Sequence, residues 1–202
     1  MAKKVLLICG SAHDEGCTRR ALREVEKTLT ECGVETDTFL LGKDAIHGCI
    51  GCRGCRKSGR CVYSDSAYDR LLAQVKTADG IVVGSPVYYA GPNGGLCAVL
   101  DRIFYSNAAL LRGKPACAVV SCRRGGASAA FDRLNKYFTI NQMPVVPSVY
   151  WNSVHGNTPE EVEQDLEGLQ VMRTLGRNMA AMLEREALSG CDEPRVATNF
   201  IR

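Results

Sequence analysis

Short apolar runs alternate with longer amphipathic stretches along almost the whole chain, and this alternation constrains the fold more than any other feature. The short runs have the length and the Gly, Pro or Ser flanks of buried strands, and the longer stretches repeat apolar residues at helical spacing. Five strands are predicted, at residues 4–9, 34–41, 80–84, 115–121 and 143–150. Helices are predicted at residues 18–32, 66–78, 92–107, 125–141 and 158–188. This order predicts an α/β fold with a doubly wound, five-stranded parallel sheet and helices on both faces.

The 202 residues form one predicted domain, because no linker-like segment divides them, with an irregular tail from about residue 189. The net charge is only +3 and the Lys and Arg residues are scattered, which gives no basis for a nucleic acid or an anionic membrane as partner. The first apolar run is too short for a signal peptide, and no run approaches a membrane span. Together with 11 cysteines, which we expect to be reduced, these features predict a cytoplasmic protein.

Three loops leave the predicted carboxyl ends of the strands, where doubly wound sheets bind their ligands. They are the serine loop (residues 10–18), the tyrosine loop (residues 85–91) and the arginine loop (residues 121–126). All three are rich in Gly, Ser, Thr or aromatic residues. We expect the functional site where these loops meet.

The serine loop, GSAHDEGCT, leads from a strand into a helix N-terminus, where backbone N–H groups and the helix dipole favour an anion. Ser11 and Thr18 add hydroxyl donors. The P-loop and GxGxxG motifs do not occur, and Glu15 stands where a phosphatase cradle after Cys9 needs arginine. The loop therefore predicts a monophosphate site; the alternative is a capped turn without a ligand.

The other two loops suit a flat heteroaromatic ring. Tyr88 and Tyr89 beside Pro86 combine aromatic and apolar groups with backbone amides. In the arginine loop, glycines permit close approach, and Arg123 and Arg124 supply cations of the kind that stabilise a reduced flavin. Each loop alone is also explained by packing or by a solvated surface, and it is their common place at one sheet edge that favours a ligand site.

Four cysteines fall within thirteen residues of the cysteine loop, which covers residues 42–65. Cys49, Cys52, Cys55 and Cys61 are separated by two, two and five residues, so that their thiolates can face a common centre. One interpretation is an iron–sulfur cluster. A second is zinc, although zinc sites usually join two separated cysteine pairs. The third is a loop of unmetallated thiols.

Together these segments resemble the NAD(P)H-dependent FMN reductases of the flavodoxin-like fold, over roughly residues 3–186. The resemblance rests on GSAHDEGCT, on SPVYYAGP with the following Leu100-Asp101-Arg102, and on SCRRGGAS; the CIGCRGCRKSGRC segment resembles the iron–sulfur flavoproteins of that group. It implies a [4Fe–4S] cluster on the four cysteines, and FMN held by residues of all three loops. These residues are Ser11, His13, Cys17 and Thr18 at the phosphate, Pro86, Val87, Tyr88 and Tyr89 along the ribityl chain and ring, and Ser121, Arg124, Gly125 and Gly126 near the ring edge. His13 and Cys17 replace the family's usual arginine and asparagine.

We therefore expect an FMN-dependent oxidoreductase that takes a hydride from NAD(P)H and reduces a flavin, quinone or similar acceptor. Hydride transfer to the flavin requires no protein acid or base, so we name no catalytic residue. One alternative is an electron carrier fed by ferredoxin through the cluster, and another is a zinc-stabilised binding protein without redox turnover. The long cysteine loop has no obvious packing partner within its own chain, which predicts a homodimer or homotetramer.

Overall fold

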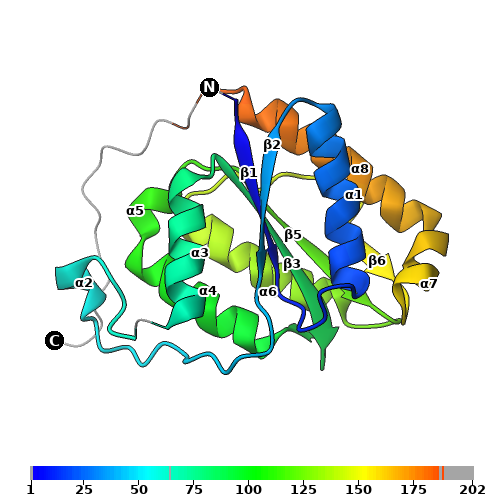
Figure 1. Cartoon of the computed structure of the whole chain (residues 1–202). Helices are drawn as coiled ribbons and strands as arrows, with labels where there is room; N and C mark the ends of the chain where they lie inside the picture. Colours follow the sequence, from blue (N-terminus) through cyan, green and yellow to red (C-terminus); the bar gives the residue numbers. More distant parts are fainter. Residues whose placement is uncertain (1, 64, 187, 189–202) are drawn as a thin grey trace, which may run out of the picture.

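The computed structural model describes residues 2–63, 65–186 and 188 (Figure 1). Its sheet has five parallel strands, namely β1 (Lys4–Cys9), β2 (Glu35–Leu40), β3 (Gly80–Tyr88), β5 (Ala116–Cys122) and β6 (Ser153–His155). Their spatial order is β2-β1-β3-β5-β6, and the two-residue strand β4 (Gly91–Pro92) pairs antiparallel with the end of β3. Since β1 is flanked by β2 and β3, the chain reverses its winding direction there, as in flavodoxin-like sheets. The predicted fold class is confirmed.

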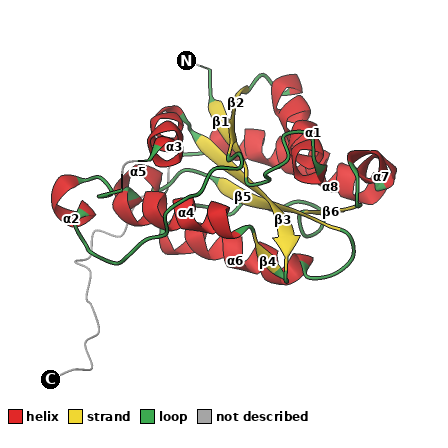
Figure 2. Cartoon of the chain, turned by 60° about the horizontal axis from the view of Figure 1, so that its bottom comes forward, coloured by secondary structure: helices red, strands yellow, loops and turns green. Residues whose placement is uncertain are grey.

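Helices cover both faces of the sheet (Figures 1 and 2). On one face lie α1 (Cys17–Glu31) and α8 (Leu166–Leu183); on the other lie α3 (Ser66–Thr77), α4 (Gly94–Ser106) and α6 (Ala127–Ile140). Three short helices complete the described part of the chain, namely α2 (Cys55–Ser58), α5 (Ala108–Leu111) and α7 (Pro159–Gln164). Alternate residues of each strand enter opposite core layers: Val5 and Leu7 pack under α1 and α8, and Leu6 and Ile8 pack under the other three helices.

The predicted position of the fifth strand is wrong. Residues 143–150 form no strand and keep only an isolated bridge between Val145 and Ala116. Pro144 and Pro147 lie in this segment, and neither has a backbone N–H to donate to a ladder. The edge strand is instead β6, which pairs with the last residues of β5.

Two predicted helices also differ from the structure. The helix predicted at residues 158–188 is divided at Asp165, whose side chain accepts a hydrogen bond from Gly168 N (2.9 Å) and caps α8. The helix predicted from residue 92 begins at Gly94, because Gly91–Pro92 belongs to β4. The predicted tail from about residue 189 lies outside the described residues. Within the described ranges, no helix is long and apolar enough to cross a membrane.

Candidate functional site

A cavity of about 700 Å³ lies at the carboxyl edge of the sheet, beyond the ends of β1, β3 and β5. Eight of the twelve residues predicted to hold the cofactor line it: Ser11, His13, Cys17, Thr18, Pro86, Val87, Tyr88 and Ser121. They come from all three predicted loops, which are far apart in the sequence. The parallel topology therefore brings the serine, tyrosine and arginine loops to one cavity.

The serine loop presents the start of α1 to this cavity. His13 N donates to Ser11 Oγ (3.0 Å), and Gly16 N donates to the His13 carbonyl (3.2 Å), which fixes the path of the loop. Gly16 is the N-cap residue of α1 and has no side chain with which to cap the helix. The N–H groups of the first turn are thus available to an anion at the positive end of the helix dipole.

Buried contacts join the three loops to one another. Thr18 Oγ1 and Ser121 Oγ lie 2.7 Å apart and share a hydrogen bond between the serine and arginine loops. Gly126 has φ +87°, and a Cβ built on it would lie 2.8 Å from Ala90 Cα in the tyrosine loop. The arginine and tyrosine loops therefore pack so closely here that only glycine fits without a shift of the backbone.

The tyrosine loop is a hairpin between β3 and β4. Its two central residues, Tyr89 and Ala90, both have left-handed backbone angles (φ 49° and 59°), as a two-residue type I′ turn requires. Tyr89 is completely exposed at this turn, whereas Tyr88 lines the cavity. Tyr89 thus lies outside the cavity lining, and its contact with the cofactor stays a prediction.

Arg124, Gly125 and Gly126 also lie outside the cavity lining, while the neighbouring Cys122 and Arg123 belong to it. The predicted place of these three residues near the ring edge stays a prediction. Gly126 has a clear structural role all the same, since it allows the close contact between the arginine and tyrosine loops.

Sequence reasoning missed two further parts of the cavity. Lys43 follows β2, and the segment Gly156–Pro159 follows β6; both line the cavity. The rule that ligands bind at the carboxyl ends of strands would have found Lys43. It would also have found the second segment, had the fifth strand been placed at residues 153–155.

The cavity contains two thiols, and neither is activated. Burial raises the pKa of both Cys17 and Cys122, which keeps them protonated near neutral pH. Cys17 Sγ donates to the Gly156 carbonyl at 3.6 Å, as a protonated thiol does. The site therefore provides polar and apolar contacts, and no thiolate nucleophile.

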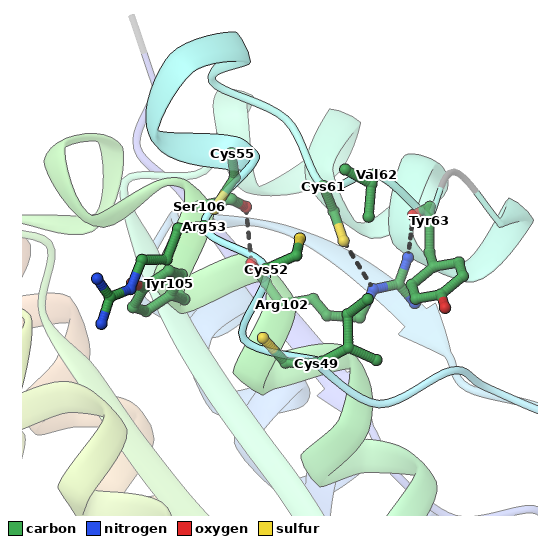
Figure 3. A pocket seen from close by; sticks show the side chains of 11 residues that line it. Cys49, Cys52, Arg53, Cys55, Cys61, Val62, Tyr63, Arg102, Tyr105 and Ser106 are labelled. Atoms are coloured by element: carbon green, nitrogen blue, oxygen red, sulfur yellow. Dashed lines mark hydrogen bonds between the residues drawn. The ribbon is translucent and has the colours of Figure 1, made fainter.

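The four cysteines of the cysteine loop line a second cavity, of about 20 Å³ (Figure 3). Cys49 and Cys52 are exposed, and Cys55 and Cys61 are partly buried. The other lining residues come from the same loop and from α4, namely Ile50, Arg53, Val62, Tyr63, Arg102, Tyr105 and Ser106. Helix α2 of this loop lies on the α4 and α5 side of the molecule, whereas α7 lies on the opposite side (Figures 1 and 2).

The cysteine cavity fits an iron–sulfur cluster by the number and chemistry of its donors. In the part of the chain that the structure describes, no three His, Cys, Asp or Glu side chains converge as ligands of a single metal ion. A [4Fe–4S] cluster needs a wider arrangement of ligands than a single ion, because each thiolate binds its own iron and the four cysteine sulfur atoms surround the cluster. Four thiols line one cavity, which is the number of protein donors that such a cluster needs, and Arg53 and Arg102 line it with them.

A doubly wound parallel sheet with the strand order β2-β1-β3-β5-β6 and a large cavity at its carboxyl edge is that of a flavodoxin-like protein. The chain belongs to the NADPH-dependent FMN reductase family, whose sequence model matches residues 3–158. Membership of this family supports an FMN-dependent oxidoreductase, and it confirms the resemblance on which the sequence prediction rested.

Similar proteins include several named iron-sulfur flavoproteins. One from Methanocaldococcus jannaschii is 33% identical over 90% of this chain and 97% of its own length. Another, from Methanosarcina thermophila, is 28% identical over 90% of this chain and 95% of its own length.

Solved structures share the fold at low sequence identity. RosB, with a bound intermediate (8-demethyl-8-formylriboflavin-5'-phosphate), has a TM-score of 0.73 at 12% identity and covers 100% of this chain and 96% of its own. A flavodoxin-type, WrbA-like protein from Agrobacterium tumefaciens has a TM-score of 0.62 at 16% identity and covers 91% and 98%. These similarities establish the flavodoxin-like fold.

Proposed function

We propose that the protein is an NAD(P)H-dependent FMN oxidoreductase that reduces a flavin, a quinone or a similar acceptor. The observation that carries this proposal is the single cavity at the sheet edge, in which residues of the serine, tyrosine and arginine loops meet. When bound there, FMN supplies the hydride and electron chemistry. The protein's part is to bind the cofactor, to orient it and to shape access to it.

The cavity offers distinct chemistry for each part of FMN. The amides at the start of α1, with the hydroxyls of Ser11 and Thr18, are proposed to hold the phosphate. Val87 and Tyr88 provide apolar and aromatic surface for the ring. Of the two arginines to which the sequence gave a charge-stabilising role, Arg123 lines the cavity, and we assign that role to it.

A second candidate function is an electron carrier that receives electrons from a donor such as ferredoxin. The observation in its favour is the cavity lined by Cys49, Cys52, Cys55 and Cys61. We propose that these four cysteines are the ligands of one [4Fe–4S] cluster. The relatives named iron-sulfur flavoproteins support this assignment. A zinc-stabilised protein without flavin is the third candidate, and metal analysis distinguishes it, because zinc without iron or flavin would then be found.

Cofactor analysis and anaerobic reduction together test the proposed function. Heat should release FMN, and no FAD, from protein purified without oxygen, because the cavity residues suit one phosphate. In a separate, unheated sample, NADPH or NADH should bleach the absorbance of the bound flavin without any added protein. Protein that binds no flavin after reconstitution would contradict both redox functions. Flavin that is reduced by ferredoxin and by neither nicotinamide would favour the electron carrier.

Thr18→Ala should weaken FMN binding by roughly 1–3 kcal/mol, the cost of an unmade hydrogen bond to a charged group. The substitution removes the hydroxyl from the proposed phosphate site and breaks the bond to Ser121. Fluorescence titration of the flavin-free protein measures the effect. Thr30→Ala is the control, since Thr30 is exposed on the same helix and its hydroxyl donates to Glu26 O (3.0 Å), within its own helix. Equal dissociation constants for Thr18→Ala and the parent would place the phosphate elsewhere.

We further propose a homodimer or homotetramer in the cytoplasm. Three consecutive apolar residues, Val149, Tyr150 and Trp151, are 64%, 58% and 57% exposed, which is typical of surfaces that another chain covers. Light scattering that finds only monomers with flavin bound would contradict the proposed assembly.

A further inference from the structure

Arg102, on α4, is a buried cation beneath the cysteine loop, with its side chain fully shielded from solvent. A buried guanidinium is costly unless its N–H groups find acceptors. All three nitrogen atoms find them in the cysteine loop: Nε donates to Cys61 Sγ (3.4 Å), Nη1 to the His47 carbonyl (3.2 Å) and to the Asp65 carboxylate, and Nη2 to the Tyr63 carbonyl. Figure 3 shows the bonds to Cys61 and Tyr63.

Tyr68, on α3, supports this arrangement from the core. The Arg102 guanidinium lies 4.8 Å from the centre of the Tyr68 ring, within cation–π range. The Tyr68 hydroxyl accepts a hydrogen bond from Cys61 N (3.2 Å) and shares another with Ser106 Oγ (2.8 Å). Cys61 is therefore held twice, by its sulfur through Arg102 and by its backbone through Tyr68.

The acceptors of Arg102 lie on both sides of the four cysteines in the sequence. His47 precedes Cys49, and Tyr63 and Asp65 follow Cys61. One side chain thus fixes both ends of the segment that carries the four thiols. Only the planar fork of an arginine serves such divergent acceptors at once, because a lysine offers a single point charge.

We propose that Arg102 is a positioning residue that orders the cysteine site before any metal binds, and that its N–H group then donates to the Cys61 thiolate of the cluster. The second part, the bond to the cluster thiolate, rests on the proposed cluster. The first part, the ordering of the metal-free site, does not. Hydrogen bonds to ligand sulfur raise the reduction potential of a cluster, because they stabilise its more negative, reduced state. Arg102 is expected to act in this way through Cys61.

Hydrogen exchange of metal-free protein that retains FMN tests the first part. In Arg102→Gln, the amides of residues 47–63 should exchange at least tenfold faster than in the parent, since both ends of the segment are released. The same amides should also exchange faster in Arg102→Lys. This variant keeps the charge, but it loses the planar fork that reaches the divergent acceptors. Tyr68→Phe is a milder variant that removes the hydroxyl bonds to the loop, to Ser106 and to Asn107, and it should give a smaller increase.

Arg133→Gln is the matched control. Arg133 also pairs with an aspartate (Asp101, 3.5 Å) and lies over a tyrosine ring (Tyr137, 4.4 Å), and both of these partners lie outside the cysteine loop. Its exchange pattern in residues 47–63 should match that of the parent. FMN content and the unfolding midpoint report whether each variant folds. Folded Arg102→Gln and Tyr68→Phe proteins with parental exchange in the loop would overturn the proposal.

Anaerobic reconstitution with iron and sulfide tests the second part. Arg102→Gln should lose most of the iron that the parent binds, and the cluster of Arg102→Lys should have a more negative reduction potential. Unchanged iron content and potential in both variants would refute the role at the cluster. If the parent itself bound FMN and no iron, the proposed cluster would fail, while hydrogen exchange would still decide whether Arg102 orders the loop.

Discussion

Cys52→Ala protein, purified without oxygen, should contain FMN and almost no iron, whereas the parent should contain about four irons per chain, as a [4Fe–4S] cluster requires. Cys52 lines the cysteine cavity, and removal of one of the four thiolates leaves one iron without its protein ligand. The flavin should stay because its proposed contacts come from other loops. Iron analysis and the absorbance spectrum measure both cofactors in the same sample.

Cys32→Ala is the control for this substitution, because Cys32 is an exposed thiol at the end of α1, outside the cysteine loop. It should keep both iron and FMN. Oxygen must be excluded from the start, since oxidation destroys exposed clusters and would imitate the expected loss. Parent protein that contains FMN but neither iron nor zinc would show that the cysteines are not ligands and that the protein is a plain FMN reductase.

Gly126→Ala should destabilise the protein by roughly 2–5 kcal/mol and weaken FMN binding. At φ +87° a side chain costs about 1–2 kcal/mol, and forcing a new methyl group against the packed Ala90 backbone costs about 1–3 kcal/mol more. Relief of the clash would move the tyrosine hairpin away from the arginine loop, and with it Val87 and Tyr88 in the cavity. Denaturant unfolding and flavin titration measure the two effects.

Gly125→Ala is a control at the adjacent position. A Cβ built on Gly125 meets no heavy atom within 4 Å among the described residues, and its φ lies outside the left-handed region. This substitution should change stability by less than about 0.5 kcal/mol, as is usual at exposed sites. Similar destabilisation by Gly125→Ala and Gly126→Ala would refute the argument from close packing.

The sequence alone determined the fold class and most of the proposed flavin site. Strands β1, β3 and β5 are largely apolar runs that are buried on both faces, so they were identifiable without a structure. Parallel topology places the carboxyl ends of neighbouring strands at one edge, and this general rule was enough to bring Ser11, Pro86 and Ser121 together. The spacing of the four cysteines likewise indicated that they share a site.

Edge pairing and burial were decided only by the tertiary structure. The last strand, Ser153–His155, has three residues and no periodic signal, and its place beside β5 depends on pairing with a strand far away in the sequence. The segment after β6, at residues 156–159, enters the cavity only through such long-range pairing. From the sequence, Arg102 is predicted to be an exposed charged residue on a helix, because arginine is mostly exposed in proteins. It becomes buried because the cysteine loop folds over α4, and a contact between segments so far apart leaves no local pattern in the chain.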